Sequence, residues 1–318
     1  MNIVLMLKEA FYEADPHLIA KLKEFGKVSV LHTDQGIEKE QLKAEVANAD
    51  IIVVNIVKLD REVLDAAPNL KLIVKYGAGV DNIDISYAHE KGIRVTSAPG
   101  LNAPAVADHA FALMLAAARN IPARDNDLKA GRWTTAMGVE VSNKTLGIIG
   151  FGAIGKELAK RATGFSMRTL VFGHHKDHAA AQQLQAQFVE QEQLFKEADF
   201  IIVATSLTPE NRHMINKETL GMMKPSAFLI NTARGGLVNE EDLMAALDQG
   251  KIQGAALDVF ESEPPVNRLP TMESVVATPH IAGATFDAVE RISDLSVLNI
   301  ERLLAGKELE HEIKPVTK

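Results

Sequence analysis

Short apolar runs rich in β-branched residues alternate with amphipathic segments along nearly the whole chain. This alternation is typical of βαβ units, which build parallel sheets. The predicted strands of a first series are 3–7, 28–31, 51–54, 72–75 and 94–96. Those of a second series are 145–150, 169–172, 200–204, 227–231, 254–257 and 275–277. The pattern therefore predicts an α/β fold with two doubly wound parallel sheets.

The chain between and after the two series bears on the domain boundaries. An apolar helix is predicted over about 103–119, and a polar stretch follows it to residue 144 with the only tryptophan, Trp133. A last helix, about 287–305, could return to pack on the first domain. Because 318 residues are ample for two cores, we expect one domain from 1–98 and 287–318 and another from 99–286.

Composition narrows the classes of function. The chain has no cysteine, which excludes disulfides, thiolate nucleophiles and cysteine zinc sites and favours a reducing cytoplasm; we expect no metal. The formal net charge of -8 without a basic stripe argues against nucleic-acid binding. No apolar run approaches the roughly 20 residues that cross a bilayer, and the amino terminus reads as a strand rather than a signal peptide. A small-molecule ligand is therefore favoured.

A glycine-rich turn follows the first strand of the second series. Gly150, Gly152 and Gly155 form a G-x-G-x-x-G pattern with Ala153 and Ile154 between the last two, and a helical stretch comes directly after. The first glycine permits a tight turn, the second admits a pyrophosphate to the backbone, and the third lets the helix pack on the strand. The helix N-terminus adds free N–H groups and a positive dipole. The turn therefore predicts a dinucleotide-binding site.

The end of the next predicted strand bears on which dinucleotide binds. An acidic residue there would bind the ribose 2′-hydroxyl of NAD, but this chain has Gly173, followed by His174, His175 and Lys176. A 2′-phosphate would meet space and positive partners instead. The alternative is a solvated turn with no influence on the cofactor. We expect NAD(P), with NADP favoured.

Polar residues follow three later strands, at the edge where ligands bind in open α/β sheets. They are Asn231, Thr232, Ala233 and Arg234, then Asp258, Glu261 and Glu263, then Thr278, His280 and Gly283. The planar fork of Arg234 can hold the oxygens of a 2-keto acid and polarise its carbonyl. His280 is a natural proton donor near neutral pH, and a carboxylate beside it would orient the ring and favour its charged form.

These three segments resemble the motifs of the D-isomer-specific 2-hydroxyacid dehydrogenase family, which are close to N-x-A-R-G-G, D-V-F-x-x-E-P and P-H-I-G-x-x-T. The resemblance extends to the glycine turn and to residues 77–82, so it covers nearly the whole chain. It implies a Rossmann cofactor domain and a flavodoxin-like substrate domain. It also implies hydride transfer between a nicotinamide cofactor and a small D-2-hydroxy acid/2-keto acid pair, such as glyoxylate or hydroxypyruvate.

The resemblance assigns catalytic roles to Arg234, Glu263 and His280. Glu263 is preferred over Glu261 because it directly precedes a proline, where the family places its acid. Asp258 matches a residue that contacts the nicotinamide carboxamide. The further matched cofactor contacts are Thr205, Thr232, Ala233 and Gly283.

The resemblance also places a substrate loop in the first domain. The expected substrate-binding residues there are Lys75, Gly77, Ala78 and Gly79, where glycines would let backbone N–H groups approach a carboxylate. Relatives that oxidise 3-phosphoglycerate carry further basic groups for the phosphate. This chain has Asn55 and Thr134 in those neighbourhoods. A phosphorylated substrate is therefore disfavoured, and 3-phosphoglycerate dehydrogenase is kept as the alternative.

Other histidines, including His109 and His213, are interpreted as structural or solvated. By resemblance we expect a homodimer in which residues 102–144 reach across to the partner; the alternative is a brace between the domains. A dinucleotide-sensing binding protein is a remote alternative function, because the family also resembles transcriptional corepressors. Those proteins carry extra terminal segments, which we do not see in this compact chain.

Overall fold

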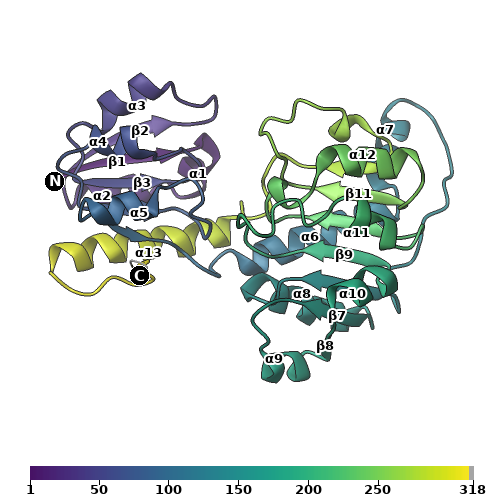
Figure 1. Ribbon diagram of the computed structural model, residues 1–318. Coiled ribbons are helices and arrows are strands. Elements are labelled where there is room, and N and C mark those ends of the chain that lie inside the picture. The colour runs from purple at the N-terminus through teal and green to yellow at the C-terminus, as the bar shows by residue number, and fades with distance from the viewer. Residues whose placement is uncertain (315–318) are drawn as a thin grey trace. The chain divides into compact units, whose positions relative to one another are not determined.

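Two compact units make up the chain. The structure, a computed structural model, describes residues 1–314. One unit contains Met1–Asn102 and the chain from Ala284 onward, and the other is Ala103–Gly283. Each unit has its own parallel sheet (Figure 1), which confirms the predicted α/β fold. Within the described residues, no helix is long and apolar enough to cross a membrane.

The smaller sheet has the order β2-β1-β3-β4-β5, with all pairs parallel. Its strands are β1 (Asn2–Leu7), β2 (Lys27–His32), β3 (Ile51–Val54), β4 (Leu72–Lys75) and β5 (Arg94–Thr96). Every residue of β3 and β4 is buried, as expected for central strands covered on both faces. This order is that of flavodoxin-like sheets, as the family resemblance implied.

Helices cover both faces of the smaller sheet and enclose two separate apolar clusters. They are α1 (Glu9–Ala14), α2 (Leu18–Lys23), α3 (Lys39–Val46), α4 (Arg61–Asp65), α5 (Ile85–Glu90) and α13 (Phe286–Leu304). The last of these, α13, comes from the end of the chain. It contributes Val289, Ile292 and Ile300 to the cluster that contains Tyr76. The hydroxyl of Tyr76 lies 2.8 Å from Oγ of Ser293. The C-terminal helix is therefore part of the first unit's core.

The larger sheet has the order β12-β11-β10-β9-β6-β7-β8, again with all pairs parallel. Its strands are β6 (Thr145–Ile149), β7 (Arg168–Phe172), β8 (Ala186–Phe188), β9 (Phe200–Val203), β10 (Phe228–Asn231), β11 (Gly254–Leu257) and β12 (Val275–Ala277). The strand order changes direction between β6 and β9, because β7 and β8 lie on one side of β6 and the later strands lie on the other, as in a Rossmann sheet. Such a switch point opens a crevice at the carboxyl ends of the strands.

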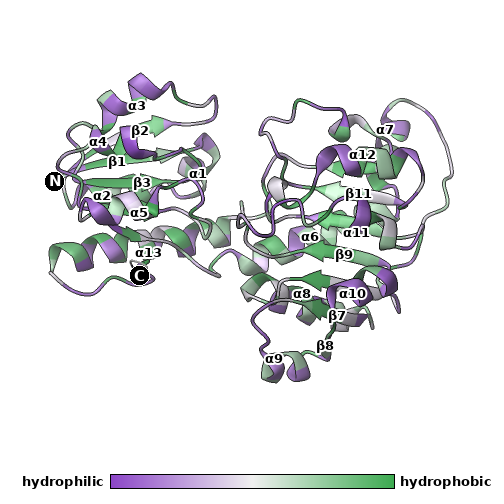
Figure 2. Ribbon diagram, in the orientation of Figure 1, coloured by the Kyte–Doolittle hydropathy of each residue, from purple (hydrophilic) through white to green (hydrophobic). Residues whose placement is uncertain are grey.

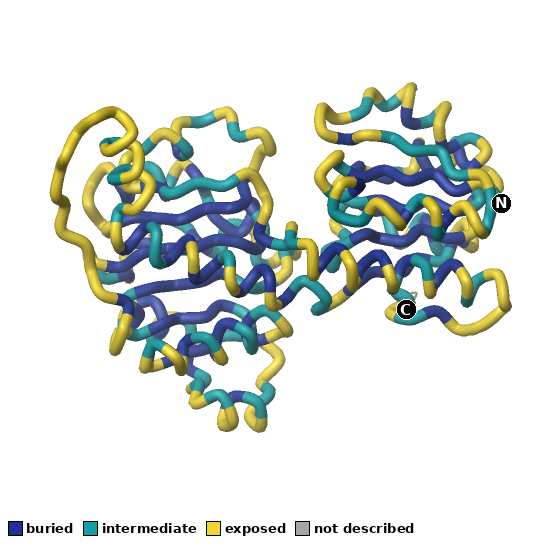
Figure 3. Tube along the Cα trace, turned by 180° about the vertical axis from the view of Figure 1, so that it is seen from behind, coloured by how far each residue is buried: buried dark blue, intermediate teal, exposed yellow. Residues whose placement is uncertain are grey.

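Helices on the two faces of this sheet enclose two further clusters. They are α6 (Ala103–Ala118), α7 (Ile121–Lys129), α8 (Ala153–Gly164), α9 (His178–Gln183), α10 (Gln191–Glu197), α11 (Lys217–Met222) and α12 (Glu240–Asp248), with short 3₁₀ turns at Gly235–Leu237 and Leu269–Thr271. Figure 2 shows most strands of both units as predominantly hydrophobic, and Figure 3 shows the central strands as mostly buried. Strand hydrophobicity and burial thus coincide.

One segment of the larger unit has no buried residue. α7 contains no buried residue, and residues 132–140 after it have no regular structure and are all exposed (Figure 3). Trp133 and Met137 are each 90% exposed. We call α7 and residues 130–140 the arm.

Candidate active site

The glycine-rich turn joins β6 to α8 at the switch point of the larger sheet. Gly150 has a φ of +103°, and a Cβ atom added there would lie 2.5 Å from the carbonyl oxygen of Ala204. A Cβ atom at Gly155 would lie 2.1 Å from the carbonyl oxygen of Gly150. By contrast, apart from Gly152 and its two chain neighbours, no described residue has an atom within 4 Å of the Cβ position of Gly152. Two glycines therefore let the backbone pack, and the third leaves the start of α8 open.

The open start of α8 fits the pyrophosphate of a dinucleotide. Gly152 caps this 12-residue helix without a side-chain hydrogen bond, so the helix dipole and the first N–H groups can attract an anion. Thr232, which follows β10, is only 7% exposed, and its Oγ1 atom has no hydrogen-bond partner among the described residues. A buried hydroxyl without a partner is costly unless a ligand satisfies it. The residues present therefore fit a bound dinucleotide.

The other predicted cofactor contacts lie along the same edge of the sheet. The backbone nitrogen of Thr205, after β9, would be 2.9 Å from a Cβ atom at Gly150. This close approach shows that the end of β9 flanks the glycine turn. The remaining predicted contacts at this edge are Ala153 and Ile154 in α8, Ala233 after β10 and Gly283 after β12.

The loop after β7 lies beside the glycine turn. A Cβ atom at Gly173 would lie 3.6 Å from the nitrogen of Phe151, which is an ordinary contact, so a side chain fits there. His174, His175 and Lys176 are exposed. The nearest acidic oxygen to the Lys176 ammonium, from Glu190, is 3.9 Å away. The loop therefore presents basic side chains next to the turn, with room at Gly173.

His280 and Glu263 form the directly paired part of the site. His280 Nδ1 lies 2.7 Å from Glu263 Oε2, and Glu263 Oε1 accepts the N–H of Phe260 at 3.3 Å. Because a carboxylate only accepts, it holds the proton on Nδ1. The His280 side chain is 36% exposed. Its other nitrogen, Nε2, is thus the one placed to exchange a proton with a bound molecule.

Asp258 holds the loop that carries His280. Its side chain is fully buried, and its two oxygens accept the N–H groups of Ile281 at 2.9 Å and Ala282 at 2.8 Å. Its backbone oxygen accepts the N–H of His280 at 2.8 Å. Burial alone would raise the pKa of Asp258, but hydrogen bonds led by that of His109 hold it below its usual value. The ionised carboxylate is therefore the centre around which the His280 loop folds, with His280 at a φ of +55°.

Arg234 follows β10, next in the sheet to β11. Asn231 fixes this loop: its Nδ2 donates to the Arg234 oxygen at 2.9 Å, and its Oδ1 accepts the N–H of Ala233 at 3.0 Å. A Cβ atom at Gly235 would lie 1.9 Å from the carbonyl carbon of Phe260, so only glycine allows the two loops to pack. Arg234, Glu263 and His280 therefore follow the ends of three neighbouring strands, β10, β11 and β12.

Glu261 has a different environment from Glu263. Its Oε2 accepts from His213 at 2.9 Å and from Arg212 at 3.0 Å, and its N–H donates to Glu240 at 2.6 Å. Burial by itself would raise the pKa of Glu261, but its hydrogen bonds, that of His213 first, hold it below the usual value. Glu261 thus braces the loop, and Glu263 is the carboxylate that contacts His280.

The predicted substrate loop lies at the carboxyl end of β4 in the first unit. Lys75 is 7% exposed, and its ammonium donates to the carbonyl oxygen of Asn55. Gly77 has a φ of +141°, and its N–H donates to the Lys75 oxygen at 2.9 Å. The candidates for binding a carboxylate through the backbone are therefore the N–H groups of Ala78 and Gly79, two residues of intermediate burial.

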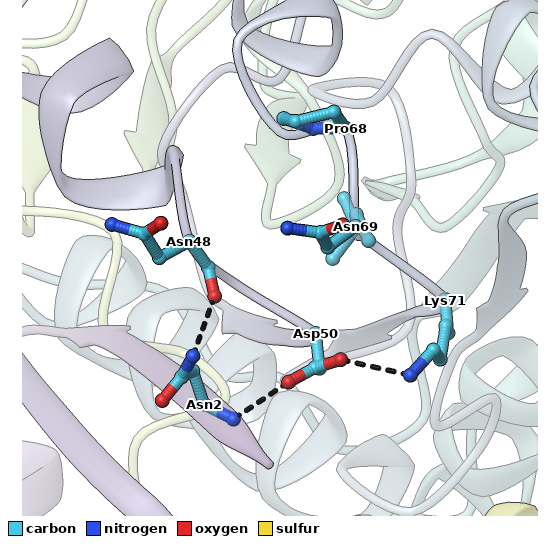
Figure 4. Close-up of a pocket in the computed structure, with 7 residues that line it drawn as sticks. Asn2, Asn48, Asp50, Pro68, Asn69 and Lys71 are labelled. Atoms are coloured by element: carbon cyan, nitrogen blue, oxygen red, sulfur yellow. Dashed lines mark hydrogen bonds and ion pairs between the residues drawn. The ribbon is translucent and has the colours of Figure 1, made fainter.

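A pocket also occurs at the opposite edge of that sheet (Figure 4). Asp50 accepts from Lys71 at 2.8 Å and from the N–H of Asn2 at 2.9 Å, and Asn2 Nδ2 donates to Asn48. The hydrogen-bonding groups of these side chains already bind one another at the amino ends of the strands, away from the edge where parallel sheets bind ligands.

No group of three or more histidine, aspartate or glutamate residues within 1–314 could hold a metal ion.

Comparison with protein-family models finds a match over residues 111–282. The matching model is described as "D-isomer specific 2-hydroxyacid dehydrogenase, NAD binding domain". It covers the glycine turn, the Arg234 and Glu263 loops, and His280.

Individual proteins are similar over most of this chain. A glyoxylate reductase from Pyrococcus furiosus is 41% identical over 91% of this chain and 89% of its own length. A D-3-phosphoglycerate dehydrogenase from Methanocaldococcus jannaschii is 41% identical over 92% of this chain, which spans only 56% of that protein. Among solved structures, D-lactate dehydrogenase from Aquifex aeolicus, complexed with NAD and lactic acid, is 30% identical with a TM-score of 0.84 over 95% of this chain and 96% of that one.

Proposed function

Because this chain belongs to the D-isomer-specific 2-hydroxyacid dehydrogenase family, we propose that it reduces short 2-keto acids such as glyoxylate and hydroxypyruvate to D-2-hydroxy acids. The observation that carries the proposal is the His280–Glu263 pair, 2.7 Å apart, at the carboxyl edge of a sheet with an open glycine turn. The opposite reaction, oxidation of the hydroxy acid, uses the same groups.

Each side chain has a distinct role in this reaction. When bound, a reduced nicotinamide dinucleotide would supply the hydride for the keto carbon. Arg234 binds the substrate oxygens through its planar fork and polarises the carbonyl. His280 transfers the proton on Nε2 to the carbonyl oxygen, which becomes the hydroxyl of the product. Glu263 accepts from Nδ1 throughout and stabilises the imidazolium before the transfer.

A panel of 2-keto acids with NADH and NADPH tests the proposal. We expect cofactor oxidation with glyoxylate and hydroxypyruvate, and a lower kcat/KM with 3-phosphohydroxypyruvate. The reason is that Asn55 and Thr134 are uncharged at positions where, by resemblance, relatives that oxidise 3-phosphoglycerate carry basic residues. A higher kcat/KM for the phosphorylated acid would establish phosphoglycerate dehydrogenase activity instead, and no oxidation with any 2-keto acid would refute both.

We further propose that the loop after β7 favours NADPH. His174, His175 and Lys176 can donate charge-assisted hydrogen bonds to a 2′-phosphate, each worth about 1.5–3 kcal/mol before solvent screening. One surviving bond gives about a tenfold preference. Gly173→Asp should move the preference toward NADH, because a carboxylate repels the phosphate and accepts from the ribose.

The measurement is kcat/KM for both cofactors in wild type and variant. Gly221→Asp is the matched control, since Gly221 is also a non-strained glycine with open space around its Cβ position, far along the chain in α11. If wild type prefers NADH and Gly173→Asp has the same ratio of kcat/KM for the two cofactors, this loop does not bind the 2′-phosphate.

We also propose a homodimer with the arm in its interface. Large apolar side chains on the arm are exposed, namely Ile121 (53%), Leu128 (60%), Trp133 (90%) and Met137 (90%). Clustered exposure of this kind marks an interaction site. Light scattering at micromolar protein should give about twice the 34.5 kDa chain mass, and Trp133→Asp with Met137→Asp should shift it toward the monomer. A wild-type mass near 34.5 kDa would contradict the proposal.

A further inference from the structure

His109 is the polar exception on the buried side of α6. The helix buries ten residues, all of them apolar. The His109 side chain is 20% exposed, and its Nε2 lies 3.0 Å from Thr278 Oγ1 and 3.5 Å from Asp258 Oδ1. The three residues come from α6, from the end of β12 and from the end of β11. They therefore form a polar cluster that contacts the loop carrying His280, residues 278–282.

The direction of each hydrogen bond in the cluster follows from its chemistry. Thr278 Oγ1 lies 2.6 Å from Asp258 Oδ1, and an ionised carboxylate can only accept. The one hydroxyl proton of Thr278 therefore points to Asp258, so Oγ1 can only accept from His109. Nε2 of His109 must carry a proton, and that proton also faces the Asp258 carboxylate. The cluster thus fixes the tautomer of His109 as well as the orientation of Thr278.

The same carboxylate positions His280. The Asp258 carboxylate accepts a hydrogen bond from the hydroxyl of Thr278, which precedes His280, and from the N–H groups of Ile281 and Ala282, which follow it. The loop is therefore held on both sides of His280. A buried carboxylate that loses a donor must find another or move. Any such movement displaces the loop, and misplacement of a catalytic group by about 1 Å can cost 10²-fold in rate.

We propose that His109 is a positioning residue, which acts through Thr278 and Asp258 to hold His280 in the geometry for proton transfer. This proposal rests on the proposed function of His280 and adds a residue outside the reacting groups. Its consequence is that the donor on Nε2, rather than the charge or the ring of His109, is what the reaction needs.

Two substitutions separate the donor from the bulk of the side chain. Leucine at 109 removes the donor and keeps an apolar side chain of moderate size, whereas glutamine can place an amide N–H near the position of Nε2. We expect His109→Leu to lower kcat for the best 2-keto acid by about tenfold or more, with KM for both substrates nearly unchanged. His109→Gln should restore kcat to within about threefold of wild type, because its amide supplies the same hydrogen bond.

A double-mutant comparison tests whether the effect passes through His280. In a His280→Asn background, adding His109→Leu should leave the residual kcat unchanged, because there is no longer a proton donor to position. Asp108→Asn is the control on the same helix, since Asp108 is 72% exposed and contacts Arg161 rather than the cluster; its kcat should match wild type. If His109→Leu does not fold, Thr278→Val, which removes the linking hydroxyl, takes its place. It should lower kcat in the wild-type background and leave the residual kcat unchanged in the His280→Asn background.

The outcomes divide cleanly. Reduced kcat in the leucine variant, rescue by glutamine and no further loss in the double mutant support the proposal. A wild-type kcat in His109→Leu overturns it, as does an equal loss in His109→Gln or a full additive loss in the His280→Asn background. Wild-type enzyme that turns over no 2-keto acid would instead refute the proposed function itself, so the two failures are distinguishable.

Discussion

His280→Asn is expected to lower kcat for keto-acid reduction by about 10²–10⁴-fold, the range typical of a lost general acid, while cofactor affinity stays nearly unchanged. Asparagine suits this test because it tolerates the left-handed backbone conformation that His280 adopts, with a φ of +55°. The substitution therefore removes the imidazole with little strain. Steady-state rates with the best 2-keto acid, together with fluorescence titration of NAD(P)H, measure both quantities.

The matched control is His311→Asn. His311 is an exposed histidine with a similar φ of +51°, so the control makes the same chemical change in the same backbone conformation. Its kcat should equal that of wild type. A near-normal kcat in His280→Asn would end the assignment of the proton donor to His280.

Arg234→Lys is expected to raise KM for the keto acid by about 10–100-fold, since a point ammonium cannot reproduce two parallel hydrogen bonds worth about 1.5–3 kcal/mol each. The substitution keeps the positive charge, so the loss reports the planar fork rather than electrostatic attraction. Asn231 and Gly235 fix the loop around Arg234 through its backbone, and those contacts remain in the variant. KM for NAD(P)H should therefore change little.

Arg268→Lys provides the comparison for this variant. The Arg268 side chain is 55% exposed and forms an ion pair with Asp248. Arg268→Lys therefore measures what an arginine-to-lysine substitution outside the site does to kcat and KM. Initial rates over a wide range of keto-acid concentration will separate KM from kcat. Unchanged kinetics in Arg234→Lys would mean that the substrate carboxylate and carbonyl are bound by other groups.

The fold could be predicted because each buried strand carries its own signal. β3 and the first three residues of β4, for example, are continuous apolar runs, and both strands are buried along their full length; burying such runs on both faces makes them central strands. β8 was not predicted, because Ala186–Phe188 is three residues long, lacks β-branched side chains and lies at the edge of its sheet. α7 was also missed, because a helix with no buried face has no periodic apolar pattern.

The site could be predicted only in part. The carboxyl ends of parallel strands lie at one edge of a sheet, so the motifs around Arg234, Glu263 and His280 could be expected at that edge from their positions after predicted strands. Their catalytic roles came from the family resemblance. The role of His109 could not be read in this way, because its contact with Thr278 joins residues 169 positions apart. A single histidine in an apolar helix was interpreted as structural, and only the folded chain shows which loop it touches.

The most direct test of D-specific hydride transfer at this site is the configuration of the product formed from hydroxypyruvate. Purified enzyme with hydroxypyruvate and NAD(P)H should yield one glycerate for each cofactor molecule oxidised, and chiral chromatography should identify it as the D enantiomer alone. L-glycerate, a racemic product, or no oxidation of NADH or NADPH with any short 2-keto acid would contradict the assignment of this site to D-specific hydride transfer.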